Sequence, residues 1–140
     1  MVLNPTINEP RDLLQRGIRR TTFCDDVVIF TVASDASERD VLQAFVRVVQ
    51  GARTPRMLWD LRARRLAAVP VEELRAQVAR MVQMASPARA RGRAAIVVST
   101  AADYDAARML MAFATEQGYG LDFNVFHDDR TALDWLFGRS

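Results

Sequence analysis

The sequence contains no lysine, one cysteine and one histidine among its 140 residues. All nineteen basic residues are therefore arginines, and with 17 acidic residues they leave a net charge of +2. Cys24 is the single cysteine, so an internal disulfide is excluded and a cytoplasmic location is the default expectation.

Long hydrophobic runs are also missing. No apolar stretch approaches the roughly 18 residues that a membrane-spanning helix needs, so we expect no membrane insertion. The first residues show no charged segment followed by an apolar one, which a secretory signal would have. Half of the residues are hydrophobic and 26% are charged, as in ordinary globular domains. We expect an N-terminal arm over residues 1–18, either loose or with a short helical turn, and a single domain over residues 19–140.

Motifs of catalysis and cofactor binding are absent as well. His127 and Cys24 lie far apart in the chain, and no spacing typical of a zinc site occurs. The sequence has no Gly-x-Ser-x-Gly elbow, no Walker loop and no Gly-x-Gly-x-x-Gly fingerprint. We therefore expect no enzymatic activity, no metal and no cofactor.

What the chain does contain is a regular alternation of strand and helix patterns. Runs of β-branched and aromatic residues predict strands over residues 19–24, 27–33, 57–61, 94–99 and 121–126. Apolar residues at helical spacing predict a helix after each of the last four strands. The resulting order is ββαβαβαβα. It predicts an α/β fold with a mostly parallel, mixed five-stranded sheet covered by helices, in which the first two strands are antiparallel.

The stretch Arg56–Arg62 organises this pattern. Because side chains alternate along a strand, Met57 and Trp59 are expected on one face of the sheet, and Leu58 and Asp60 on the other. The strand then leads into a loop that contains three arginines.

The order and spacing of several segments resemble the STAS fold of anti-sigma-factor antagonists and of the cytoplasmic tails of sulfate transporters. More closely, the chain resembles the bacterial SpoIIAA-like group of small, stand-alone STAS domains, over roughly residues 20–137. The segments that carry the resemblance are Leu58–Arg62, Arg93–Val97, Tyr104–Arg108, Val125–Phe126 and Ala132–Leu136. The resemblance implies a non-catalytic regulatory or protein-interaction domain, with a protein partner or a second copy of the chain.

One departure from that family concerns the loop after the middle strand. In the antagonists this turn carries an Asp-Ser pair whose serine is phosphorylated. Here residues 60–70 contain no serine or threonine, and the next serine is Ser86. The phosphorylation switch therefore does not transfer to this chain.

The carboxyl ends of parallel strands meet at one edge of the sheet, where ligands usually bind in open α/β sheets. Helix N-termini open at the same edge, and they favour anions. A small anionic ligand would suit this crevice. The favoured alternative is that Ser37, Thr100 and Asp128 are ordinary helix N-caps and that Asp60 simply pairs with Arg62 or Arg108. The candidate ligand-binding residues are Asp35, Asp60, Arg62, Arg64, Arg65, Thr100, Tyr104 and Arg108.

The arginines form two sequence clusters, at residues 62–65 and 89–93. One cluster follows a strand and the other precedes the next strand, so in a parallel pair they lie at opposite ends, on the order of 17–20 Å apart. Nucleic-acid binding needs a contiguous basic face and is not expected. Met84 and Met109 lie off the apolar stripes of their helices and are candidates for a homodimer or docking surface.

Overall fold

The computed structural model describes residues 17–23, 27–49, 56–84 and 92–138. Its strands are β1 (Ile18–Phe23), β2 (Val27–Val32), β3 (Arg56–Asp60), β4 (Arg93–Val97) and β5 (Asp122–Phe126). Its helices are α2 (Glu38–Val49), α3 (Val71–Met84), α4 (Ala101–Glu116) and α5 (Asp129–Leu136), with a short 3₁₀ helix, η1 (Leu66–Ala68), before α3.

The predicted α/β fold is confirmed. The five strands form one sheet in the order β1-β2-β3-β4-β5, in which β1 and β2 are antiparallel and the remaining neighbours are parallel. This arrangement matches the topology of the STAS fold. The sequence predicts central positions for residues 27–33 and 57–61 and leaves the rest of the strand order open. The structure places β3 at the centre of the sheet with β2 beside it.

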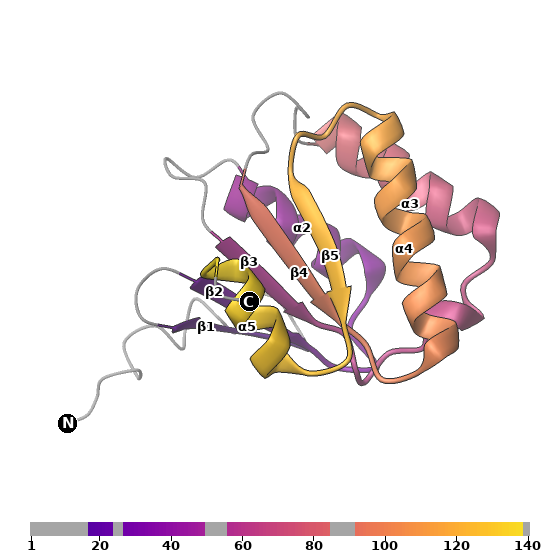
Figure 1. Ribbon diagram of the computed structural model, residues 1–140. Helices are drawn as coiled ribbons and strands as arrows, with labels where there is room; N and C mark the ends of the chain where they lie inside the picture. The colour runs from indigo at the N-terminus through magenta and orange to yellow at the C-terminus, as the bar shows by residue number, and fades with distance from the viewer. Residues whose placement is uncertain (1–16, 24–26, 50–55, 85–91, 139–140) are drawn as a thin grey trace.

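Helices cover the two faces of the sheet unequally. In Figure 1, α2, α3 and α4 lie on one side of the sheet and α5 lies on the other. The alternation predicted for β3 follows this division, because Met57 and Trp59 pack in the larger core and Leu58 packs in the smaller core beneath α5. Trp59 stacks on Phe30 of β2 with ring centroids 4.2 Å apart. The central strand is therefore buried on both faces, as its continuous apolar run indicates.

The two edge strands are more open. Only Ile18 of β1 is buried, and in β5 only Val125 is buried, while Asp122 is exposed and the other residues are partly buried. The position of β5 at an edge of the sheet is as its sequence predicts. The strand predicted over residues 94–99 ends at Val97, although the Val98 amide still donates to the Phe126 carbonyl at 2.9 Å. Ile18 belongs to β1, and the rest of the predicted N-terminal arm, apart from Gly17, lies outside the described residues.

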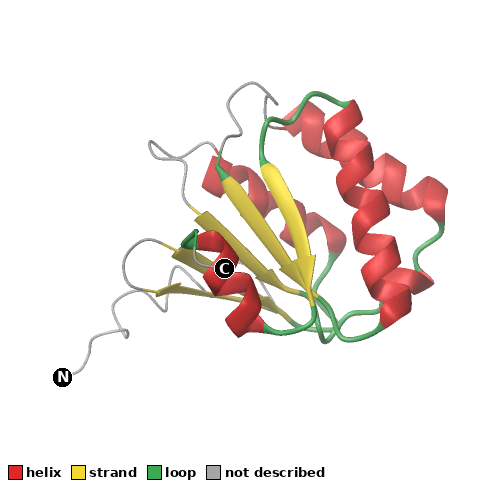
Figure 2. Ribbon diagram, in the orientation of Figure 1, coloured by secondary structure: helices red, strands yellow, loops and turns green. Residues whose placement is uncertain are grey.

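Side-chain caps hold the loops that follow the carboxyl ends of β2, β4 and β5. Ser37 accepts from the amide of Asp40, and Thr100 accepts from the amide of Asp103, both at 3.0 Å. The cap of α5 is Asp128, whose Oδ1 accepts from the Thr131 amide at 2.8 Å. Figure 2 shows that the loops after β2, β3, β4 and β5 gather at one end of the sheet.

None of the helices that the structure describes is long and apolar enough to cross a membrane. Met84 and Met109 are exposed, at 38% and 37% of their full accessibility, as their positions on α3 and α4 predict.

Candidate functional site

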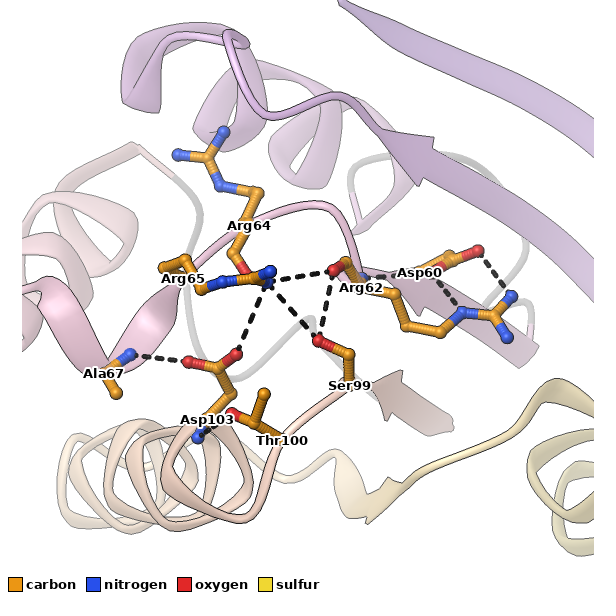
Figure 3. A network of polar contacts seen from close by, with 8 residues as sticks. All are labelled: Asp60, Arg62, Arg64, Arg65, Ala67, Ser99, Thr100 and Asp103. Carbon is orange, nitrogen blue, oxygen red and sulfur yellow. Dashed lines mark hydrogen bonds and ion pairs between the residues drawn. The ribbon is translucent and has the colours of Figure 1, made fainter.

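The candidate site is the loop between β3 and α3, together with the N-terminus of α4. The Leu61 amide donates to the Val97 carbonyl at 2.9 Å, which extends the pairing of the two strands one residue beyond the end of β3. The loop then turns, with the Arg64 amide donating to the Leu61 carbonyl at 3.0 Å, and enters η1. Because β3 and β4 are parallel, the polar residues that follow them meet at this end (Figure 3).

Asp60 binds Arg62 through two parallel hydrogen bonds. Nε of Arg62 donates to Oδ1 at 2.9 Å, and Nη2 donates to Oδ2 at 2.8 Å. The Arg62 amide adds a third bond to Oδ1 at 3.1 Å. The hydrogen bonds from the Arg62 side chain lower the pKa of Asp60 and raise that of Arg62. Of the two partners that the sequence allowed for Asp60, the structure selects Arg62.

Arg64 points toward the loop that follows β2. Its Nη1 donates to the carbonyl oxygens of Ala36 and Ala33, at 2.8 and 3.2 Å. Asp35 lies exposed in the same loop. Arg64 therefore ties the loop after β3 to the loop after β2 through main-chain carbonyls.

Arg65 curls back over its own loop toward α4. Its Nη1 lies 3.1 Å from the Arg64 carbonyl oxygen and 3.4 Å from both the Arg62 carbonyl oxygen and Ser99 Oγ. The same nitrogen lies 4.0 Å from Oδ2 of Asp103. The side chain of Arg65 is nonetheless 64% exposed.

Asp103 was not among the predicted ligand-binding residues, yet it belongs to this site. Its side chain is 1% exposed, and Oδ1 accepts the Ala67 amide of η1 at 2.9 Å. A carboxylate three residues after an N-cap often turns back toward its own helix start. Here the carboxylate of Asp103 joins α4 to η1. Its spacing from Ala107 and Ala114, which are buried on α4, was the available signal that Asp103 faces inward.

Tyr104 and Arg108 form a separate cluster with His127. The rings of Tyr104 and His127 are stacked with centroids 5.2 Å apart, and the guanidinium of Arg108 lies 6.0 Å from the centre of the Tyr104 ring. The predicted site residues thus fall into four groups. Asp60 pairs with Arg62, and Arg64 reaches the loop that holds Asp35. Arg65 and Thr100 both contact Asp103, and Tyr104 lies with Arg108.

These contacts change the electrostatic expectation for the site. Each of the three arginines in the loop donates to an acceptor of the protein itself, and Arg62 faces a carboxylate that neutralises it. The site is therefore less strongly cationic than a run of arginines suggests. A second arginine cluster was predicted at the opposite end, and there Arg93 donates to the Trp135 carbonyl at 2.6 Å near the C-terminus of α5. Arg89 and Arg91 lie outside the described residues.

Within the described ranges, no group of three or more His, Cys, Asp or Glu residues could hold a metal ion. Cys24 lies outside these ranges, so the structure does not place it relative to His127.

Comparison with protein-family models, with curated proteins and with solved structures found no match to this chain. The topology and the contacts above therefore carry the functional argument.

Proposed function

We propose that the chain is a non-catalytic STAS-like domain, of the SpoIIAA-like type, that regulates or binds another protein through the loop after β3 and the start of α4. The observation that carries this proposal is the way in which the loop is held. Arg62, Arg64 and Arg65 each bind acceptors of the chain itself, and Asp103 holds η1 from the side of α4.

A loop that is fixed before binding loses little conformational entropy when a partner docks on it. The anti-sigma-factor antagonists, whose fold the sequence resembles, have a phosphorylatable serine in this loop, whereas residues 60–70 here contain no serine or threonine. We infer that this surface acts in one constant state, recognised by its shape and its charges.

The neighbouring cluster of Tyr104, Arg108 and His127 adds an aromatic and cationic component at the same end of the sheet. Tyrosine and arginine are enriched among the residues that dominate protein–protein binding energy. His127 and Arg108 are exposed, and Tyr104 is partly exposed, so the cluster is accessible to a partner.

The test is affinity capture from a native cell extract with the immobilised domain, combined with light scattering to detect self-association. Arg62→Ala and Tyr104→Ala are expected to lose the captured partner or the dimer. Arg19→Ala is the matched control, because Arg19 is an exposed arginine on β1, at the edge of the sheet. A monomer that captures nothing, or an equal loss in the control, would contradict the proposal.

A second candidate function is the binding of a small anionic ligand at the same end. It is favoured by the exposure of Arg62 and Arg65, whose side chains are 39% and 64% accessible. Arg65 lies beside the N-terminus of α4, and Arg62 lies near Asp129 at the start of α5. Asp60 and Asp103 oppose it because both carboxylates face these arginines. A thermal-shift screen of nucleotides, acyl carboxylates and phosphates tests it, with Arg62→Ala Arg65→Ala as the variant that must lose any stabilisation.

A further inference from the structure

A niche lined by hydrogen-bond acceptors lies between the loop after β3 and the start of α4. Its acceptors are the carbonyl oxygens of Arg62 and Arg64, Oγ of Ser99 and Oδ2 of Asp103. All four face one atom, Nη1 of Arg65, at 3.4, 3.1, 3.4 and 4.0 Å respectively (Figure 3). The Ser99 hydroxyl also donates to the Arg62 carbonyl at 3.3 Å.

The deepest of these acceptors is incompletely satisfied. Asp103 is 1% exposed, and while Oδ1 binds the Ala67 amide, Oδ2 has no hydrogen-bond partner. Within the part of the chain that the structure describes, it is the one buried side-chain oxygen or nitrogen in that condition. Buried polar atoms are nearly always hydrogen-bonded, so an oxygen left unpaired behind an exposed side chain indicates a place for a donor.

Arg65 fills the niche poorly. Its shortest bond there is 3.1 Å, whereas the guanidinium of Arg62 meets Asp60 at 2.8 Å. One terminal nitrogen carries two hydrogens and cannot serve four acceptors at once. The side chain of Arg65 also starts from within the loop that forms the niche. It therefore bonds to the carbonyl oxygens of Arg64 and Arg62 in its own loop, and its Nη1 stays 4.0 Å from Oδ2 of Asp103.

We propose that this niche is a binding site for a guanidinium group, which Arg65 occupies in the free protein and which an arginine side chain of the partner takes over in the complex. The inference deepens the proposed function and rests on it only for the source of the guanidinium. An incoming arginine approaches from outside the loop and can present two donors to Asp103, the fork geometry that a guanidinium makes with a carboxylate.

The chemistry of the niche selects this ligand class. Four acceptors repel an anion, and a planar group with five donors satisfies more of them than an ammonium group with three. Arg65 competes as an intramolecular ligand, so the apparent affinity of the wild-type niche is the intrinsic affinity reduced by the fraction of time for which Arg65 is displaced. Removal of Arg65 should therefore increase the affinity.

The test is a titration of Arg65→Ala and wild-type protein with methylguanidinium, followed through the NMR amide signals of Ala67, Ser99 and Asp103. The variant is expected to bind about tenfold tighter or more, as for a site that is blocked nine-tenths of the time. Arg65→Ala Asp103→Asn should lose that gain. Arg75→Ala, which removes an exposed arginine of α3, should match the wild type.

Methylurea, a neutral molecule of the same shape, is the ligand control and should not bind. Equal affinity of Arg65→Ala and wild type for methylguanidinium, or binding of methylurea as tight as that of methylguanidinium, would overturn the guanidinium site. A second experiment tests whether the guanidinium comes from a partner protein, and it uses the protein retained in the affinity capture. Methylguanidinium should elute that protein from the immobilised domain, and methylammonium at equal ionic strength should not. Failure to elute would overturn the arginine source, and a failure to capture any partner would count against the proposed function separately.

Discussion

The contact between Asp103 and Ala67 gives a sharp prediction about stability. Asp103→Ala removes the acceptor of the Ala67 amide, a bond of 2.9 Å to a side chain that is 1% exposed. Hydrogen bonds to charged groups contribute about 1.5–3 kcal/mol, but the same substitution also removes Oδ2, whose lack of a partner costs about 1–3 kcal/mol. The two effects largely offset each other in Asp103→Ala.

Asp103→Asn separates them. Asparagine keeps an acceptor for the Ala67 amide and replaces the unpaired charged oxygen with a neutral group, so we expect this variant to be about 1 kcal/mol more stable than Asp103→Ala. Helix propensity works in the opposite direction, since alanine is favoured over asparagine by up to about 0.7 kcal/mol. A result in favour of asparagine therefore cannot arise from propensity.

The assay is urea unfolding of the two variants and the wild type, with the midpoint and slope fitted separately. Hydrogen exchange at the Ala67 amide provides the local measurement. It should be faster in Asp103→Ala and close to wild type in Asp103→Asn. If alanine is the more stable variant, or if the Ala67 amide exchanges equally in both, then Asp103 does not hold η1 and the reasoning is refuted.

Three further predictions concern other parts of the fold. The pKa of Asp60 is lowered in the folded state, so its contribution is present above its ordinary value of about 3.9 and is lost as pH falls through the lower folded value. Asp60→Asn should therefore flatten the acid side of the stability–pH curve measured by urea unfolding, and an unchanged slope would contradict the pairing with Arg62. Burial raises the pKa of Tyr119 to about 12, so absorbance at 295 nm in a Tyr104→Phe variant should not report tyrosinate until the pH approaches that value. Stability should fall from about pH 10 upward, where tyrosine in the unfolded chain ionises; titration of Tyr119 near pH 10 in the folded protein would show that its ring is not buried. Trp59→Ala should cost about 3–5 kcal/mol in urea unfolding, because the side chain is 6% exposed in the larger core, and a loss under 1 kcal/mol would contradict that packing.

The fold could be predicted from the sequence because its signals are local and repeated. The alternation of side chains along β3 predicted that Met57 and Trp59 lie on one face of the sheet and Leu58 on the other. The structure places Met57 and Trp59 in the larger core and Leu58 in the smaller core. Parallel pairing followed from the alternation of strands and helices. The order of the strands could not be derived, since several arrangements of βαβ units satisfy the same local patterns.

The contacts made by the candidate site residues could not be derived from the sequence. Sequence position identified Arg64, yet its partners lie 28 and 31 residues earlier in the chain, and a long flexible side chain gives no pattern from which such a contact can be derived. Asp103 was not among the predicted ligand-binding residues. Its burial depends on the packing of η1 against α4, in which Asp103 binds the amide of Ala67, 36 residues earlier in the chain.

The central claim is that the arginines of the loop after β3 bind the protein's own acceptors and not an external anion. The most direct measurement is NMR of the arginine Nε–H groups during a titration with inorganic phosphate, with Arg62 assigned by substitution. The account predicts that the Arg62 signal is protected from exchange, that Asp60→Asn removes this protection, and that phosphate shifts none of the signals of Arg62, Arg64 and Arg65. Saturable shifts of all three signals, with no effect of Asp60→Asn, would contradict it.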